Sequence, residues 1–367
     1  MNTRRKFITQ AAALAAAPLM GARMLRALAA PAKRKLGFAL CGLGNLNTHQ
    51  VAPALQQTAN CRLAGIITGT PAKAVRWRAQ YGIPERNVYS YETMHRIADN
   101  DDIDVVYIAT PNGLHLDSAL VAAQAGKHVF CEKPMEISVE RCRRMIEAVK
   151  AANRVLAIGY RCRFEPHHLE CMRIAHDREF GRLRLIDAHF GNRVEAGVWR
   201  LKRALAGGGP LMDVGIYALQ ATRYLTGEEP VWISAATTQG DPARFSEVEE
   251  SIVWEAKFPG GAVSHCGSSY DTPGLGYFRA IAERGWFGLE PAFNYDGTQG
   301  LRSDGRPIEF PPTDQFAVEM DDFAQCIMEG KATRVPGEEG LRDVSLMMSI
   351  YESARTGRPV DLRRTST

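Results

Sequence analysis

Short apolar runs alternate with helical stretches between residues 35 and 160 of the chain. The runs KLGFALC, CRLAGIIT, IDVVYIAT, KHVFCE and RVLAIGY have the length of strands and almost no polar positions. The segments between them have helical periodicity, and two of them begin at residues typical of N-caps, Thr70 before Pro71 and Ser138. Strands that are apolar on both faces and joined by helices predict a doubly wound parallel sheet covered by helices.

The pattern changes after about residue 160. The segments LRLIDAHFGN, WISAATTQ, SIVWEAKFPGGAVSHCGSSY, YFRAIAE and WFGLE are predicted strands, and FPGGA is a predicted hairpin turn. Helices are expected over PHHLECMRIAHDREF, after GGGP, near 316–329 and near 338–356. The predicted fold is therefore α/β: a Rossmann domain over 33–157 precedes an α+β domain over 158–367 with an open, mostly antiparallel sheet.

The first 29 residues have the organisation of an export signal. A basic start, Arg4-Arg5-Lys6, precedes an apolar stretch and the small-residue site Ala27-Leu28-Ala29. Thr3, the arginine pair and Phe7 together resemble a twin-arginine signal, which directs folded proteins to the export machinery; an ordinary secretory signal is the alternative. No later segment reaches the roughly 18 apolar residues of a membrane span, so we expect a periplasmic protein without stable membrane association.

Charge and cysteine content narrow the classes of function. Five of the 45 Lys and Arg residues lie in the predicted signal, which has no acid, so the rest carries 40 basic and 41 acidic residues. This balance gives no reason to expect a nucleic-acid partner. None of the eight cysteines forms a CxxC pair, which gives no metal or redox motif. Because several lie in apolar runs, we expect mostly free thiols.

The sequence CGLGNLN follows the first predicted strand and precedes a helix. Gly42 would form the tight turn, Gly44 would let the backbone approach a pyrophosphate, and Asn47 replaces the third glycine of the usual pattern. The motif alone is weak, but the strand–turn–helix context supports a dinucleotide site. The second strand then ends at Thr68, with Gly69 and Lys73 following and no acidic residue. An acid at this place favours NAD, so its replacement by Thr68 and Lys73 favours NADP.

Two further motifs carry groups for proton transfer. ATPNGLH and CEKPM end the third and fourth strands, at the edge where such sheets bind ligands, and Lys133 is expected beside the nicotinamide. In GGGPLMDVGIY, Asp213 and Tyr217 are four residues apart and share a helix face. A neighbouring ammonium and a positive nicotinamide would lower the pKa of Tyr217 and let it accept a proton. From the spacing alone, a core tyrosine is the more common explanation.

Taken together, AGKHVFCEKPM, ATPNGLH, the glycine turn and GGGPLMDVGIY resemble the Gfo/Idh/MocA oxidoreductases over essentially the whole predicted mature chain. The tyrosine at 217 and the twin-arginine pattern are similar to the exported, sugar-oxidising branch of that family, which holds NADP. The resemblance implies a catalytic group of Lys133, Asp213 and Tyr217. It implies cofactor contacts from Gly42, Gly44, Asn45, Leu46, Thr68, Gly69, Lys73, Tyr91, Thr110, Pro111, Asn112, His115, Glu132, Lys133, Arg161, Trp199 and Arg200. It implies substrate contacts from Tyr160, Phe164, Trp199, Asp213 and Tyr217.

The resemblance also implies a reaction. Tightly bound NADP(H) would be exported with the folded protein, be reduced by an aldose oxidised at C1, and be reoxidised by a second sugar that becomes an alditol. An NADP-dependent sugar or diol dehydrogenase that exchanges its cofactor is one alternative. An NAD-assisted glycoside hydrolase is another, although the relatives of that kind carry Val where this chain has Lys133. A non-catalytic NADP-binding sensor is a third. The resemblance further implies a homodimer or higher homo-oligomer.

Overall fold

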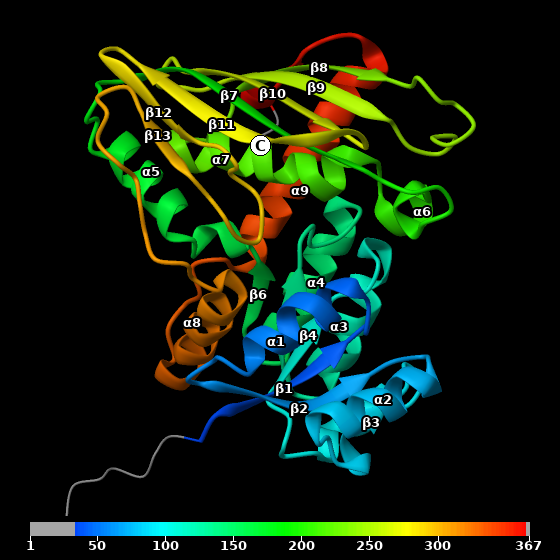
Figure 1. The fold of residues 1–367 in the computed structure, drawn as a ribbon. Coiled ribbons are helices and arrows are strands. Elements are labelled where there is room, and N and C mark those ends of the chain that lie inside the picture. Colours follow the sequence, from blue (N-terminus) through cyan, green and yellow to red (C-terminus); the bar gives the residue numbers. More distant parts are fainter. Residues whose placement is uncertain (1–33, 365–367) are drawn as a thin grey trace, which may run out of the picture. The chain divides into compact units, whose positions relative to one another are not determined.

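The computed structural model describes residues 34–364, so the predicted signal peptide lies outside the described residues. Residues 36–364 belong to one compact unit that contains two sheets (Figure 1). The fold therefore combines a parallel Rossmann-like sheet and a mostly antiparallel sheet, as the sequence pattern predicts.

The parallel sheet has six strands in the order β3-β2-β1-β4-β5-β6. All of its strand pairs are parallel, and the order reverses at β1, as in doubly wound folds. Its strands are β1 Leu36–Cys41, β2 Cys61–Ile67, β3 Val88–Tyr89, β4 Val105–Ile108, β5 His128–Glu132 and β6 Leu156–Gly159. Every residue of β1, β4 and β6 is buried, which accounts for their continuous apolar runs. The edge strand β3 was missed because two residues carry no periodicity.

Helices connect these strands, and their ends follow the predicted signals. They are α1 Ala52–Leu55, α2 Pro71–Tyr81, α3 His115–Gln124 and α4 Val139–Ala151. Ser138 caps α4 by accepting a hydrogen bond from the Arg141 amide. Thr70 precedes α2 with extended backbone, but its side chain makes no capping bond.

The second sheet has eight strands in the order β13-β12-β11-β7-β10-β9-β8-β14. They are β7 Leu183–Arg193, β8 Trp232–Thr238, β9 Ser251–Lys257, β10 Val263–Ser269, β11 Asp271–Ala282, β12 Gly285–Leu289, β13 Gly300–Arg302 and β14 Val360–Asp361. Only the central β7–β10 pair is parallel, and the FPGGA turn closes the β9–β10 hairpin as predicted. Strand β9 alternates buried and exposed residues, which is typical of a sheet with one covered face.

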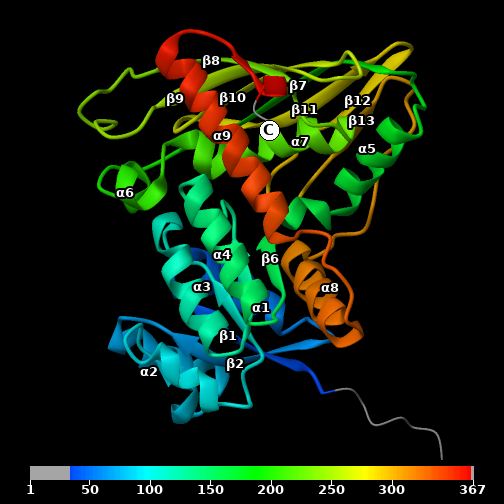
Figure 2. The same cartoon turned by 180° about the vertical axis from the view of Figure 1, so that it is seen from behind.

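The remaining helices are α5 Pro166–His176, α6 Arg203–Ala206, α7 Ile216–Thr226, α8 Gln315–Glu329 and α9 Gly337–Thr356. Helices α5 and α7 lie on one face of the second sheet, and among the described residues no helix covers its other face (Figures 1 and 2). Helix α8 packs on α1 and β2 of the parallel-sheet half, whereas α9 packs on both β8 and α4 and so connects the two halves. Within the described residues, no helix is long and apolar enough to cross a membrane. Cys41 and Cys131 are buried free thiols, as their apolar surroundings predict.

Candidate active site

The glycine turn after β1 has the backbone that a dinucleotide site needs. Gly42 has a φ of 87°, and a Cβ there would lie 2.8 Å from the carbonyl oxygen of Ala109, so only glycine fits. A Cβ on Gly44 would meet no atom within 4 Å, which leaves open space on the side where a ligand would approach. Asn45 is exposed and Leu46 is partly buried beside this space.

Asn47, which departs from the usual motif, reinforces the turn. Its side chain is fully buried, and Nδ2 donates a hydrogen bond of 2.7 Å to the carbonyl oxygen of Gly42. A short helical turn, Asn47–Val51, begins at this residue and leads into α1. The usual third glycine allows close packing of helix and strand. Asn47 instead connects the helix to the first glycine of the turn by a hydrogen bond.

The residues expected at the nucleotide's 2′-phosphate gather at the carboxyl end of β2. Thr68 is buried, and a Cβ on Gly69 would lie 3.2 Å from the ring of Tyr91. Lys73, in the first turn of α2, donates from Nζ to the carbonyl oxygen of Leu43 over 2.9 Å. The structure thus brings Lys73 beside the glycine turn, from which its ammonium group can reach an anionic ligand.

The loops after β4 and β5 are held together by His115. This buried ring places Nε2 2.9 Å from the carbonyl oxygen of Thr110 and Nδ1 3.1 Å from that of Pro134. Burial lowers the pKa of His115 below its ordinary value. Asn112 in turn donates from Nδ2 to Ala206 over 2.9 Å. These side chains position the strand-end loops, and the half-exposed Pro111 lies between them.

Lys133 and Asp213 meet although they are 80 residues apart: Lys133 follows a strand of the parallel sheet, and Asp213 lies in the helical turn Leu211–Gly215 before α7. Lys133, directly after β5, donates from Nζ to the backbone carbonyl of Asp213 over 2.6 Å and lies 3.4 Å from Oδ1. Arg200 Nε and the Tyr270 hydroxyl donate to Oδ2 of the same carboxylate over 2.7 Å and 3.2 Å. Burial acts to raise the pKa of Asp213, but the charges of Arg200 and Lys133 outweigh it and hold this pKa below its usual range.

The hydroxyl group of Tyr217 has a different partner from the expected one. Arg161 Nε donates to it over 3.0 Å, whereas Lys133 Nζ lies 4.7 Å from the centre of the tyrosine ring. Burial raises the pKa of Tyr217 above its ordinary value, and the charge of Arg161 offsets only part of this increase. The sequence predicted that neighbouring cations lower this pKa. The protein's own cations do not achieve this, because burial of the phenolate disfavours its charge more than those cations stabilise it.

Arg161 is itself fixed by a segment that the sequence did not single out. The side chain is 3% exposed, and Nη1 donates to Gln315 Oε1 over 2.8 Å and to the carbonyl oxygen of Asn294 over 3.0 Å. The rings of Phe190 and Phe293 pack against Tyr217, with centroids 5.6 Å and 5.8 Å away. The loop containing residues 293–298 has no motif, so only its contacts in the fold identify it.

These groups border one cavity of about 1030 Å³. Its lining includes Lys133, Arg161, Arg200, Asp213 and Tyr217, together with residues of 293–298 and 310–316. The aromatic side chains of Phe190 and Phe293 also line it. A cavity with several charged donors and an aromatic wall suits a polyhydroxylated ligand.

Four predicted residues do not line the cavity themselves. Tyr160 and Phe164 are 1% and 3% exposed, and neither lines the cavity. Burial, and then the charge of the Asp343 carboxylate of α9, raise the pKa of the Tyr160 hydroxyl. Trp199 stacks on Arg200, with the guanidinium carbon 4.7 Å from the ring centre, and Arg200 is the one of the two that lines the cavity. Glu132 is buried and accepts a hydrogen bond of 2.7 Å from the Tyr107 hydroxyl.

Three family models match the chain in succession. Residues 36–160 match the oxidoreductase family with an NAD-binding Rossmann fold, and residues 168–288 match the GFO/IDH/MocA C-terminal domain. Residues 283–362 match the C-terminal alpha/beta domain of the oxidoreductase family. Together they cover nearly all of the described chain.

Individual proteins are similar over the same length. D-xylose 1-dehydrogenase (NADP(+)) 2 of Haloferax volcanii is 32% identical over 333 residues, which are 89% of this chain and 99% of that protein. The crystal structure of aldose-aldose oxidoreductase from Caulobacter crescentus complexed with glycerol has 43% identity and a TM-score of 0.87, over 90% of this chain and 100% of that one. Levoglucosan dehydrogenase in complex with NADH and levoglucosan has a TM-score of 0.78 at 23% identity, over 90% of this chain and 100% of that one, a likeness of fold.

Proposed function

Since the chain belongs to the Gfo/Idh/MocA family of oxidoreductases, we propose that it oxidises an aldose at C1 to the aldonolactone and reduces a second sugar to the alditol, with NADP(H) bound tightly throughout. The observation that carries this proposal is the meeting of Lys133, Asp213 and Tyr217 in one cavity at the carboxyl end of the parallel sheet. The similarity to an aldose-aldose oxidoreductase over nearly the whole chain supports the two-sugar reaction.

The residues present fit NADP(H). Gly44 leaves space for a pyrophosphate, and Lys73 lies beside that turn at a strand end without an acid. Thr110 has a buried hydroxyl oxygen without a hydrogen-bond partner, at the strand end that faces the cofactor site in such folds. When bound, the nucleotide would supply the hydride acceptor for the first sugar and the hydride donor for the second.

The chain's own groups would move the proton. Tyr217 would take the proton of the C1 hydroxyl of the first sugar and return it to the carbonyl oxygen of the second. Arg161, which donates to the tyrosine oxygen, would stabilise that oxygen when it becomes anionic. Asp213 holds Lys133 and Arg200 at the edge of the cavity, where their N–H groups can orient sugar hydroxyls.

An NADP-dependent dehydrogenase that exchanges its cofactor with solution is the second candidate. The similarity to D-xylose 1-dehydrogenases named for NADP(+) favours it. The two candidates share the site residues and differ in how fast the nucleotide leaves.

The spectrum of protein purified without added nucleotide distinguishes them. The proposal predicts about one NADP(H) per chain, a reduced-nicotinamide absorbance band after one aldose is added, and loss of that band after an acceptor sugar is added. Lactone and alditol should form in equal amounts. An apoprotein that turns over only with added NADP would exclude the two-sugar reaction and support the exchanging dehydrogenase.

Export and assembly follow as parts of the same proposal. Residues 1–29 would direct the folded, NADP-loaded protein through the twin-arginine machinery to the periplasm, where no nicotinamide pool would replace a lost cofactor. We further propose a homo-oligomer that uses the open face of the second sheet, where Leu185, Val253 and Ile281 are 39%, 46% and 37% exposed. Fractionation of cells and light scattering of the purified protein test these two points.

A further inference from the structure

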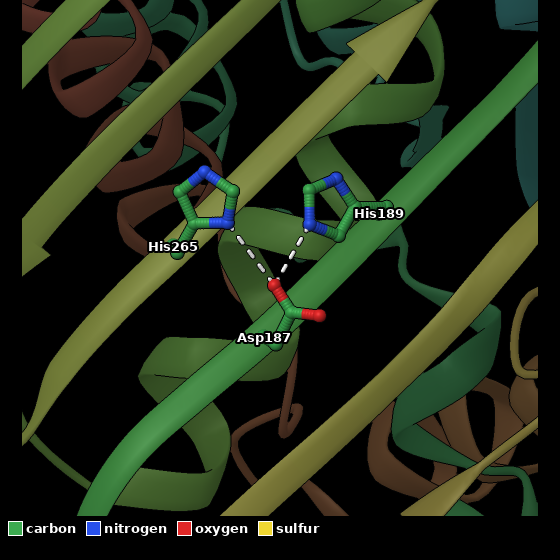
Figure 3. Close-up of side chains that lie close together, drawn as sticks. All are labelled: Asp187, His189 and His265. Atoms are coloured by element: carbon green, nitrogen blue, oxygen red, sulfur yellow. Dashed lines mark hydrogen bonds and ion pairs between the residues drawn. The ribbon is translucent and has the colours of Figure 1, made fainter.

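The open face of the second sheet carries a cluster of metal-ligand side chains that the oxidoreductase site does not use. Asp187 and His189 are two residues apart on β7, so both side chains project from the same face. His265 of β10 lies opposite Asp187 in the parallel register, on that same face. Figure 3 shows the three side chains turned toward one another across the two strands.

Their ligand atoms converge on one point. His189 Nε2 and His265 Nδ1 lie 2.9 Å and 3.1 Å from the same carboxylate oxygen, Oδ1 of Asp187 (Figure 3). One ligand atom from each residue lies within 4.8 Å of the other two. In a tetrahedral zinc site with bonds of about 2.0–2.2 Å, neighbouring ligand atoms are roughly 3.3 Å apart. Small side-chain rotations would therefore bring this set to coordination distances.

The surroundings fix these side chains. Tyr277 of β11 donates from its hydroxyl to Asp187 Oδ2 over 2.8 Å, which leaves Oδ1 directed at the two imidazoles. A Cβ at position 267, opposite His189, would lie 2.8 Å from His189 Nδ1, so the glycine there makes room for the ring. Hydrogen bonds that orient the ligands from outside are a regular feature of metal sites. The His265 side chain is 49% exposed in the single chain, so its ring is accessible to an ion before a partner subunit covers this face.

We propose that Asp187, His189 and His265 bind a divalent transition-metal ion of the zinc class on the open face of the second sheet. Two imidazole nitrogens and one carboxylate oxygen suit zinc, with a water molecule completing the coordination. Magnesium and calcium prefer oxygen ligands and are disfavoured by the two nitrogens. Because the ion would link β7 to β10, its role would be to stiffen the centre of the sheet.

Equilibrium dialysis of untagged, chelator-treated protein against Zn²⁺, followed by metal analysis, tests the proposal. We expect about one Zn²⁺ per wild-type chain and at least about tenfold weaker binding after His265→Ala or Asp187→Ala. Tyr277→Phe should weaken binding by roughly tenfold, the lower end of the effect of losing an outer hydrogen bond. His95→Ala is the matched control, because it removes an exposed histidine that lies outside the second sheet. This variant should bind Zn²⁺ as wild type does.

Two further measurements make the outcome decisive. Co²⁺ should give visible absorption bands of a four- or five-coordinate site in wild type and in His95→Ala, and these bands should vanish in the double variant His189→Ala/His265→Ala. Mg²⁺ should not displace Zn²⁺. Failure of the wild type to bind Zn²⁺, or undiminished binding by the folded double variant, would overturn the site and leave a hydrogen-bonded cluster that only braces the strands. These experiments measure metal binding and not oxidoreductase activity, so their outcome does not depend on whether the proposed reaction is correct.

Discussion

At the scale of single residues, Tyr217 tests the proposed proton transfer. The Tyr217→Phe variant keeps the ring that packs against Phe190 and Phe293 but loses the hydroxyl group bound by Arg161. We expect the turnover of aldoses to fall by roughly 10²–10⁴-fold, the usual contribution of acid–base catalysis, while the amount of bound nucleotide stays unchanged. Single-turnover absorbance measures the first quantity and nucleotide release after denaturation the second. Near-wild-type turnover would assign the proton transfer to another group.

Lys73 tests nucleotide selection at the same scale. Its ammonium lies beside the glycine turn, and no acid occupies the end of β2. Lys73→Ala should weaken NADP binding by at least about tenfold and change NAD binding little, because only NADP carries the 2′-phosphate. Arg76→Ala, an exposed change on the same helix, is the control for general loss of positive charge. If both nucleotides were weakened equally by Lys73→Ala, the lysine would not read the 2′-phosphate.

At the scale of elements, a buried ionic cluster joins α7 to α9. Arg223 of α7 donates to Asp343 and, over 2.9 Å, to Glu339, both on α9. Gln220 Nε2 also donates to Asp343, over 2.6 Å. Burial raises the pKa of Asp343 from 3.8 to about 6, because it outweighs the opposing charge of Arg223. The folded state then binds this proton more tightly than the unfolded state does.

The stability contributed by Asp343 should therefore fall as the pH rises from about 4 to about 6, since the folded protein must lose a proton that it holds more tightly. Urea unfolding of wild type and Asp343→Asn at several pH values isolates this contribution. The free energy of unfolding of the wild type relative to the variant should decrease across this range. Asp99→Asn, an exposed change, should show no such trend. A pH-independent difference for Asp343→Asn would mean that this carboxyl group titrates alike in both states.

At the scale of the whole molecule, bound nucleotide should contribute strongly to thermal stability, because a ligand that binds only the folded state stabilises it by mass action. At a ligand concentration about a thousand times Kd this amounts to roughly 4 kcal/mol. Two glycine variants separate the intrinsic stability from this contribution. Without nucleotide, Gly44→Val should have a melting temperature near that of wild type, since its Cβ meets no atom within 4 Å. Added NADP should not raise this melting temperature, because the side chain would fill the space for the nucleotide.

Gly42→Ala provides the contrast. Residue 42 has a φ of 87°, and the Cβ of an alanine there would lie 2.8 Å from the carbonyl oxygen of Ala109. This variant should therefore have a lower melting temperature than wild type even without nucleotide. Melting curves with and without NADP give both quantities. A nucleotide-dependent increase in Gly44→Val equal to that of wild type would show that the open space beside Gly44 is not where the nucleotide binds.

The sequence alone determined the features that depend on local pattern. The apolar runs predicted five of the six parallel strands, because a strand buried on both faces needs apolar residues throughout. The sequence also predicted three features that depend on spacing within one segment. They are the glycine turn, Lys133 at the end of a strand, and the i, i+4 pair of Asp213 and Tyr217. Two-residue strands such as β3 and β14 escaped because they contain no full period of the pattern.

Only the tertiary structure decided which distant groups meet. Arg161, rather than Lys133, binds the Tyr217 hydroxyl because Gln315 and Asn294, more than 130 residues further along, fix the guanidinium there. The pKa of Tyr217 is likewise set by burial, which depends on the whole fold and which no spacing reveals. Tyr160 and Phe164 are an example: their sequence neighbours Arg161 and Glu165 line the cavity, whereas their own side chains are buried in the core. The cluster of Asp187, His189 and His265 exists only because β7 and β10 pair in one register.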